Sequence, residues 1–339
     1  MSNPNQDILI WGAGAIGGTV GAYLARAGYD VTLVDADPAH VAAIRQDGLH
    51  ITGPIDDMVV RPPAFTPAEV QGKWQRVFLA VKAHHTTEAA RQLLPHLADD
   101  GYVLSLQNGL CEPLIVDVVG AQRVIGAFVN FYADWVAPGE LLYSNRAAVV
   151  IGELDGRVTP RAEQLLQDLH HFEPDAILSD DVDGYLWGKL AYGAMLFAQA
   201  VGMSGIADVL ERDDLFPLWR GLAQEVVDVA QAEQIDPRGF NGFEPAAFAA
   251  GAPEARARAS IQAMVDFNRP NTKTHSGVWR DLAIRKRKTE VDMIAVVVTV
   301  GRQHGKPCPI LSQLVAMIGE IEQGKRAQTD DNLLELVPA

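Results

Sequence analysis

The sequence has 339 residues, of which 48% are hydrophobic and 21% charged, and its formal net charge is −15. At roughly 100–200 residues per domain, this length predicts two domains, and the composition excludes a mainly disordered, collagen-like or disulfide-stapled protein. The acidic balance argues against binding nucleic acid or an anionic membrane through the overall electrostatic field. The N-terminus is short and polar, and only two cysteines occur, so we expect a cytoplasmic protein that needs no disulfide.

The first half of the chain alternates between strand-like and helix-like patterns. Short apolar runs predict strands at residues 8–11, 29–34, 77–81, 103–106, 124–128, 147–151 and 176–178. Amphipathic or small-residue stretches predict helices at 15–27, after Asp37-Pro38, at 86–97 and at 160–169. This alternation predicts a Rossmann-like α/β domain, in which helices cover both faces of a doubly wound parallel sheet.

The second half changes to long helical stretches in which no period of two persists. Helices are expected at residues 182–201, 215–232, 261–267, 290–304 and 310–323, with a loop rich in Gly, Ala and Pro at 240–253. Residues 190–207 carry no formal charge, and a buried helix that breaks near 202–205 is favoured over a membrane span. We therefore predict a Rossmann domain at 1–180 and an all-helical substrate and dimerisation domain at 181–339.

A glycine-rich segment follows the first expected strand and opens the first expected helix. Gly12, Gly14 and Gly17 fit the pattern G-x-G-x-x-G, with Ala15 and Ile16 before the last glycine. The first glycine permits a tight turn, the second lets a pyrophosphate approach the backbone, and the third lets helix and strand pack closely. The start of the helix attracts phosphate through its N–H groups. We expect these five residues to bind a dinucleotide; the alternative is a glycine-rich turn in an ordinary α/β unit.

Asp35 ends the second expected strand. An acid at this place accepts hydrogen bonds from the ribose hydroxyls of NAD and repels a 2′-phosphate. No Arg or Lys lies between Val31 and Ile44. We therefore expect NAD rather than NADP as the cofactor. The alternatives are that Asp37 shares or takes this role, or that Asp35 only caps a loop.

Two polar residues follow expected strands of the sheet. Lys82 comes directly after the strand at 77–81, and Asn108 follows the strand at 103–106. Ligands of such sheets bind at the carboxyl ends of the strands, so both residues are candidates to border a nicotinamide. A surface lysine and an ordinary Asn-Gly turn are the alternatives.

The helical half holds a second group of candidates. Lys189 precedes the long uncharged stretch, and burial on an apolar helix lowers the pKa of a lysine, which suits a proton donor or acceptor. The alternative is a helix-end lysine that extends to water. A basic run at 285–288 precedes Thr289 and Glu290, and we expect Thr289 to cap the next helix with Asp292 at its third position. The run either holds an anionic substrate group or forms a solvated basic loop.

Five motifs carry a resemblance to a known family. In chain order they are Gly12-Ala13-Gly14-Ala15-Ile16-Gly17, Val81-Lys82-Ala83, Gln107-Asn108-Gly109, Leu186-Trp187-Gly188-Lys189-Leu190 and Arg287-Lys288-Thr289-Glu290-Val291-Asp292. Together they resemble the ketopantoate reductase family (2-dehydropantoate 2-reductases) over nearly the whole chain. The resemblance implies a Rossmann domain followed by a helical domain, an active site in the cleft, and reduction of a 2-oxo acid with a nicotinamide cofactor.

The resemblance also implies roles for single residues. Lys189 matches the general acid that protonates the carbonyl oxygen, and in the reverse reaction it would take the alcohol proton. Glu290 matches the carboxylate that hydrogen-bonds a substrate hydroxyl. Asn108 matches the amide near the nicotinamide and the substrate, and Lys82 matches a lysine that lines the same cleft. No metal is expected.

The sequence departs from the family at the substrate positions. The family commonly has Asn four and eight residues after the catalytic lysine, whereas Gly193 and Phe197 stand here. They make the expected site roomier at one place and more apolar at the other. The family's Ser-rich stretch before the glutamate is also altered, so His275, Ser276 and Arg280 are candidates for a different substrate contact. These changes leave the chemistry intact and open the identity of the substrate.

We interpret the chain as an NAD-dependent oxidoreductase that interconverts a 2-hydroxy acid, or a related hydroxy-carboxylate, with its oxo form. True 2-dehydropantoate reduction is the close alternative, and the late Lys-Thr-Glu-Val-Asp motif argues against a β-hydroxyacid or opine-type dehydrogenase. A non-catalytic NAD(H) sensor would keep the glycines and Asp35 but would not need Lys189 and Glu290. We expect a small-molecule substrate, no nucleic-acid or membrane partner, and a homodimer.

Overall fold

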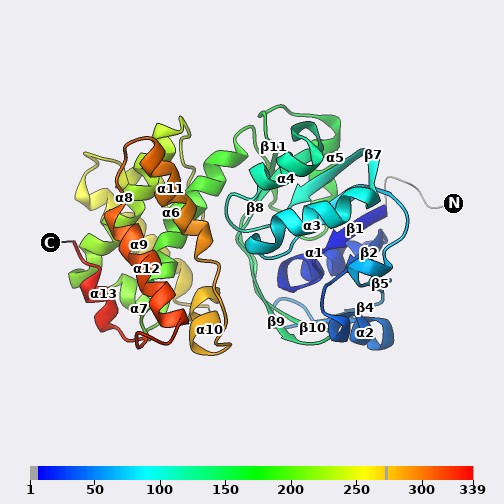
Figure 1. The fold of residues 1–339 in the computed structure, drawn as a ribbon, viewed down its shortest axis with the longest axis horizontal. Helices are drawn as coiled ribbons and strands as arrows, with labels where there is room; N and C mark the ends of the chain where they lie inside the picture. The colour runs from blue at the N-terminus through cyan, green and yellow to red at the C-terminus, as the bar shows by residue number, and fades with distance from the viewer. Residues whose placement is uncertain (1–6, 272–273, 339) are drawn as a thin grey trace. The chain divides into compact units, whose positions relative to one another are not determined.

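The computed structural model describes residues 7–271 and 274–338. Two compact units divide the chain after Val182. Figure 1 shows an α/β architecture in the first unit and helices in the second, which confirms the predicted fold class.

An eight-stranded sheet forms the centre of the first unit. Its strands, in order across the sheet, are β12 (Ile177–Leu178), β11 (Val149–Glu153), β8 (Val124–Val129), β7 (Leu97–Ser105), β6 (Trp74–Leu79), β1 (Asp7–Trp11), β2 (Asp30–Val34) and β5 (Ala64–Phe65). All neighbouring strands pair in parallel except β11 and β8, which pair antiparallel. The central strands β1, β6 and β8 are almost wholly buried, so their apolar runs gave a clear pattern in the sequence.

Helices pack around this sheet. They are α1 (Ala15–Arg26), α2 (Pro38–Asp47), α3 (Thr86–Leu93), α4 (Glu112–Val119) and α5 (Pro160–Leu169), and short 3-10 turns cover Pro67–Glu69, Ala83–His85, Leu94–His96 and Ala121–Arg123. The helix expected at 86–97 ends earlier because the 3-10 turn at Leu94–His96 contains Pro95, which cannot donate a helical hydrogen bond. Strand β7 then begins at Leu97, well before the expected residue 103, and exposes Asp99 and Asp100 at its start.

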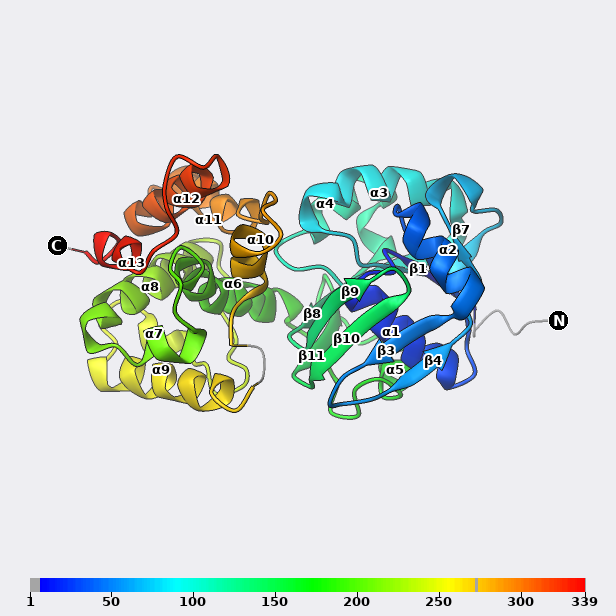
Figure 2. The ribbon, with the colours of Figure 1, turned by 90° about the horizontal axis from the view of Figure 1, so that it is seen from below.

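A second sheet was not predicted from the sequence. Its strands, in order, are β4 (Met58–Val60), β3 (Leu49–Thr52), β10 (Glu140–Asn145) and β9 (Tyr132–Ala137). Two antiparallel hairpins, β3–β4 and β9–β10, join through a parallel pairing of β3 with β10. Figure 2 shows this sheet beside α1. Its strands are short and partly exposed, so their apolar pattern was too weak to distinguish them from loops.

The second unit consists mainly of helices. They are α6 (Val182–Gln199), α7 (Ile206–Leu210), α8 (Phe216–Ala232), α9 (Glu254–Asn268), α10 (Gly277–Ala283), α11 (Asp292–Gln303), α12 (Pro309–Glu322) and α13 (Asp331–Glu335), with 3-10 turns at Asp213–Leu215 and Pro245–Phe248. Helix α6 ends at Gln199, so the uncharged stretch 190–207 is broken as expected. Within 7–271 and 274–338, the apolar helices all fall short of what a membrane crossing requires.

Candidate active site

The glycine-rich segment between β1 and α1 forms a tight loop. Gly12 has a φ of +104°, and a Cβ there would lie 2.8 Å from the backbone carbonyl carbon of Ala80. A Cβ on Gly17 would lie 2.1 Å from the carbonyl oxygen of Gly12, so only glycine lets α1 close onto the loop. Gly14, which precedes the first residue of α1, has nothing within 4 Å of its Cβ position. The loop thus leaves open space at a helix N-terminus, where N–H groups attract phosphate.

The residues expected to flank the phosphate and ribose lie at the same edge of the sheet. Ala15 and Ile16 form the first turn of α1, and both are partly exposed. Asp35 follows β2, the neighbour of β1, and its Oδ1 accepts a hydrogen bond of 2.9 Å from the backbone N–H of Asp37. The Asp37 carboxylate caps α2 by accepting from the N–H of Ala39 at 2.9 Å. Asp37 is therefore engaged in capping, which favours Asp35 as the ribose partner.

Lys82 and Asn108 lie in loops that follow the neighbouring strands β6 and β7. Lys82 is exposed and Asn108 is partly buried. Gln107 links the two loops, because its Nε2 donates to the carbonyl oxygen of Val81 at 2.9 Å and to the hydroxyl of Thr86 at 2.8 Å. The sequence did not single out Gln107. Both candidates thus belong to one connected group of loops at the carboxyl ends of the strands.

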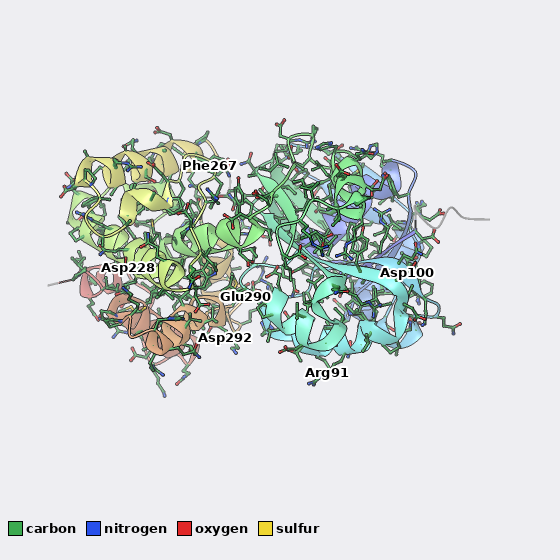
Figure 3. The ribbon with its side chains drawn as sticks, turned by 90° about the horizontal axis from the view of Figure 1, so that it is seen from above. Arg91, Asp100, Asp228, Phe267, Glu290 and Asp292 are labelled. Carbon is green, nitrogen blue, oxygen red and sulfur yellow. The ribbon has the colours of Figure 1, made fainter. Side chains whose placement is uncertain are left out.

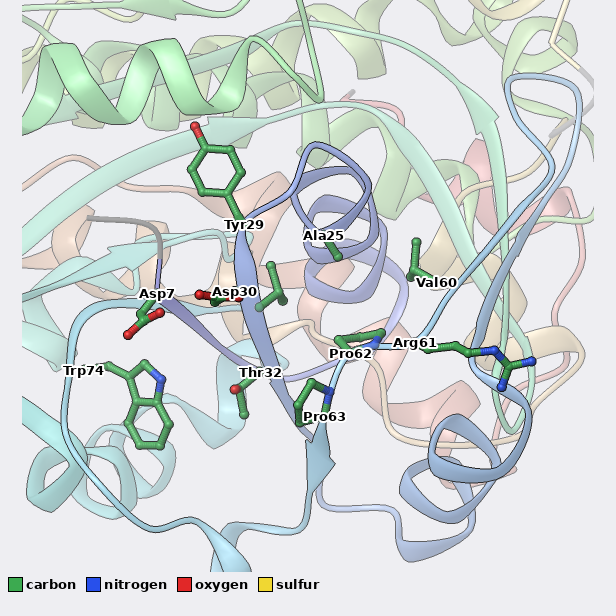
Figure 4. A pocket seen from close by; sticks show the side chains of 11 residues that line it. Asp7, Ala25, Tyr29, Asp30, Thr32, Val60, Arg61, Pro62, Pro63 and Trp74 are labelled. Carbon is green, nitrogen blue, oxygen red and sulfur yellow. The ribbon is translucent and has the colours of Figure 1, made fainter. Parts of the chain in front are cut away.

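The pocket in Figure 4 lies elsewhere in the first unit. Its lining includes Asp7 and Asp30, which begin β1 and β2, and Trp74, which begins β6. These are the amino ends of the strands, whereas Gly12 and Asp35 follow the carboxyl ends. Ligands of parallel α/β sheets bind at the carboxyl ends, so this pocket is separate from the expected nucleotide site.

In the second unit, Lys189 and Glu290 come close together although about a hundred residues separate them in the sequence. Burial lowers the pKa of Lys189 from 10.5 to about 8, and the nearby carboxylate of Glu290 opposes part of this shift. Gly188, the preceding residue, lets the chain pack tightly, since a Cβ there would lie 2.0 Å from the carbonyl oxygen of Arg238. Figure 3 labels Glu290 next to Asp292, the first residue of α11. The pair is a lysine with a lowered pKa beside an acid, which suits proton transfer.

The backbone before Glu290 is held by an acid at the end of α12. Thr289 is fully buried, and both its N–H and its hydroxyl donate to Oε1 of Glu322, at 2.7 and 2.6 Å. The prediction that Thr289 caps α11 is therefore wrong: its hydroxyl bonds Glu322, and Val291 occupies the cap position. Sequence reasoning also missed Glu322, because it lies 33 residues from Thr289.

The basic run before Glu290 is largely neutralised by acids of the chain. Asp281, which is buried, accepts from Arg285 at 3.0 Å and from Arg287 at 2.9 Å. Lys288 pairs with Asp292 at 3.1 Å. These ion pairs favour the interpretation of the run as a structural segment over a role in holding the substrate.

The remaining substrate candidates of the sequence lie on or near α6. Gly193 is one turn after Lys189, and nothing lies within 4 Å of its Cβ position. Phe197, one further turn along, is buried. Residues at i and i+4 share a helix face, so Gly193 leaves room beside Lys189 and Phe197 adds apolar surface on that face.

His275 and Ser276 are tied to the far end of α6. The ring nitrogens of His275 bond the carbonyl oxygen of Met203 at 3.0 Å and the hydroxyl of Thr274 at 2.8 Å. The Ser276 hydroxyl caps α10 and also reaches the carbonyl oxygen of Leu196. Arg280, within α10, is partly buried. The structure thus uses His275 and Ser276 to fasten α10, and it brings neither of them into a described contact with Lys189.

Comparison with known proteins agrees with the predicted family. The model described as "Ketopantoate reductase PanE/ApbA" matches residues 8–156, and the one for its C-terminal domain matches residues 181–322. A 2-dehydropantoate 2-reductase of Mesorhizobium japonicum is 28% identical over 92% of this chain and 97% of its own length. One from Archaeoglobus fulgidus is 27% identical over 94% of this chain and 99% of its own.

Solved structures share the fold. A PanE/ApbA family ketopantoate reductase from Ralstonia eutropha has a TM-score of 0.80 and 27% identity, covering 94% of this chain and 99% of that one. A D-mandelate dehydrogenase in a ternary structure with NADH and anilino(oxo)acetate has a TM-score of 0.83 over the same shares. Its sequence identity is 20%, so the likeness concerns the fold alone.

Proposed function

The chain belongs to the ketopantoate reductase family, and on that premise we propose that it transfers hydride between NAD(H) and a 2-hydroxy or 2-oxo acid. The family matches cover parts of both units, so the chain is an oxidoreductase of this family with a nicotinamide cofactor. The observation that carries the proposed chemistry is the pairing of Lys189 with Glu290.

The first unit supplies a backbone that fits a dinucleotide. The space that Gly14 leaves open at the start of α1 admits a pyrophosphate, and a side chain there would fill it. Asp35 would accept hydrogen bonds from the ribose hydroxyls, and its charge would repel a 2′-phosphate. These two features support NAD over NADP. Lys82 and Asn108 would border the nicotinamide end.

The second unit supplies the proton. A bound nicotinamide would provide or accept the hydride at C2 of the substrate. During reduction Lys189 donates a proton from Nζ to the carbonyl oxygen, and the resulting neutral amine regains a proton from water. During oxidation the neutral amine takes the hydroxyl proton. A pKa of about 8 keeps both forms of Lys189 accessible near neutral pH, and Glu290 stabilises the charged form and would hydrogen-bond a substrate hydroxyl.

The helix face around Lys189 favours a substrate with a bulky or apolar substituent. Gly193 leaves open space, and Phe197 replaces a polar group with an aromatic ring. Reduction of 2-dehydropantoate itself is the second candidate, which the names of the two curated relatives favour.

Initial rates with NADH and NADPH test this proposal. We would measure reduction of 2-dehydropantoate and of an aromatic 2-oxo acid such as phenylglyoxylate with each cofactor. Turnover with NADH supports the proposal, and a preference for the aromatic acid supports the role of Gly193 and Phe197. Turnover with NADPH alone would refute the role given to Asp35. Binding of NADH without turnover of any 2-oxo acid would point to a sensor.

We also propose that the protein acts as a homodimer in the cytoplasm. Light scattering coupled to size-exclusion chromatography of the purified chain tests the dimer, and a mass of one chain would refute it. Cell fractionation tests the compartment.

A further inference from the structure

A buried histidine connects the glycine-rich loop to the second sheet. His40, in the first turn of α2, is 1% exposed. Its Nε2 lies 3.0 Å from the carbonyl oxygen of Ala13, within the glycine-rich loop. Its Nδ1 lies 2.9 Å from the backbone nitrogen of Gly139, in the turn between β9 and β10. The imidazole thus spans two segments that are more than a hundred residues apart, and no motif in the sequence pointed to it.

The two partners fix the tautomer of this imidazole. The N–H of Gly139 can only donate, so Nδ1 must carry a lone pair and accept. The carbonyl oxygen of Ala13 can only accept, so Nε2 must carry the proton and donate. The geometry therefore assigns His40 as a neutral ring with its proton on Nε2.

The turn that holds the ring is itself locked. The carbonyl oxygen of Gly139 accepts from the N–H of His50 in β3 at 2.8 Å. Gly139 has a φ of +78°, and a Cβ there would lie 3.0 Å from the Cβ of Ala43 on α2. Since Gly139 is fixed from both sides, it holds the orientation of the His40 ring. The second sheet thereby acts as a rigid support for the donor at Nε2.

The bond to Ala13 orients one peptide plane of the glycine-rich loop. Because a peptide unit is planar, fixing the carbonyl oxygen of Ala13 also fixes the direction of the N–H of Gly14. The N–H groups of Gly12 and Ala13 both donate to the carbonyl oxygen of Val34, at 2.8 and 3.0 Å, which holds the preceding part of the loop. The peptide between Ala13 and Gly14 is therefore held on its carbonyl side by His40, next to the space expected for the pyrophosphate.

We propose that His40 is a positioning residue for dinucleotide binding, which holds the Ala13–Gly14 peptide in its phosphate-binding orientation by donating from Nε2. This inference rests on the proposed function, since it requires a dinucleotide at the glycine-rich loop. It assigns the second sheet a purpose that the reaction chemistry does not give it, namely preorganisation of the cofactor site.

Two substitutions separate the two bonds of the ring. In His40→Asn the amide oxygen reaches the place of Nδ1 and keeps the bond to Gly139, but nothing replaces the donor to Ala13. In His40→Gln the amide nitrogen reaches the place of Nε2 and keeps the bond to Ala13, but the bond to Gly139 is lost. The Kd for NADH would be measured by fluorescence titration, together with Tm, kcat and the KM for NADH. His50→Asn, a change on β3 next to the same turn, serves as the control.

The expected result is that His40→Asn raises the Kd and KM for NADH about tenfold with kcat at saturating NADH within twofold, since one hydrogen bond to the loop is lost. His40→Gln should lower Tm more but bind NADH nearly as the unaltered chain does, and His50→Asn should leave the Kd unchanged. In ¹⁵N NMR of the unaltered chain, the proton of His40 should lie on Nε2. If both His40 variants lose NADH affinity in proportion to their loss of Tm, or if His40→Asn binds normally, the inference is wrong. If the unaltered chain binds neither NADH nor NADPH, the proposed function fails as well.

Discussion

The glycine-rich loop of the first unit and the Lys189–Glu290 pair of the second are built in opposite ways. The loop is made of backbone, and three glycines within six residues of sequence determine its shape. The pair is made of side chains from α6 and from the segment before α11, and a third element, α12, holds that segment through Glu322. A backbone site can be recognised from local spacing, whereas a side-chain site depends on supports that are distant in the sequence.

The largest expected effect concerns the side-chain site. Lys189→Ala removes the proton donor, so kcat for 2-oxo acid reduction should fall about 100- to 10,000-fold, the usual contribution of a general acid. The Kd for NADH should stay nearly unchanged, because the loop belongs to the other unit. Stopped-flow rates and fluorescence titration measure the two quantities. Lys306→Ala, which alters an exposed lysine of the same unit, is the control. Retention of activity in Lys189→Ala would refute the mechanism.

The ribose contact tests the loop side of the comparison. Asp35→Ser should reduce kcat/KM for NADH about ten- to a hundredfold, the range for losing a hydrogen bond to a charged group. It should also improve use of NADPH, because the negative charge that repels a 2′-phosphate is gone. Asp37→Ser keeps a capping side chain and should preserve the preference for NADH. An unchanged ratio of NADH to NADPH use in Asp35→Ser would contradict the assignment.

Two glycines of the loop separate folding from binding. Gly17→Ala should lower the free energy of unfolding by about 1–3 kcal/mol, because its methyl group would overlap the carbonyl oxygen of Gly12. Gly14→Ala should leave Tm unchanged, since its methyl group meets no protein atom, yet raise the Kd for NADH about tenfold through lost phosphate contacts. Thermal unfolding and NADH titration of both variants give the answer. Equal loss of Tm in the two variants would show that the space at Gly14 is not reserved for a ligand.

The smallest expected effect concerns the support of the pair. Glu322→Ala removes the acceptor of two Thr289 hydrogen bonds and should cost about 1–3 kcal/mol of stability. If Glu290 then moves away from Lys189, burial lowers the pKa of the lysine further. Reduction needs the protonated amine, so the alkaline fall of the reduction rate should shift to lower pH. Glu322→Gln retains an acceptor oxygen and should keep the original pH profile. An identical profile in all three proteins would limit Glu322 to a structural role.

The same contrast explains what the sequence could predict. The strands of the large sheet are buried apolar runs, and the glycine spacing is local, so the fold class, the family and the loop were all recognisable. The second sheet was missed because its short strands are half-exposed and pair across about ninety residues. Thr289 was assigned to the wrong helix cap because its true partner, Glu322, lies on another helix. Contacts that only tertiary structure creates left no periodic signal.

The lowered pKa of Lys189 also has a consequence for stability. In the unfolded chain this amine would titrate near 10.5, and in the folded chain it titrates near 8, so the unfolded state binds more protons between these values. Below pH 8 the buried charge therefore opposes folding, by about 3 kcal/mol for a difference of this size. This penalty fades as the pH rises from about 8 toward 10.5. The residue that enables proton transfer is thus a weak point of the fold, and Lys189→Met should give an inactive protein that resists denaturant better at pH 7 and loses that advantage above pH 10.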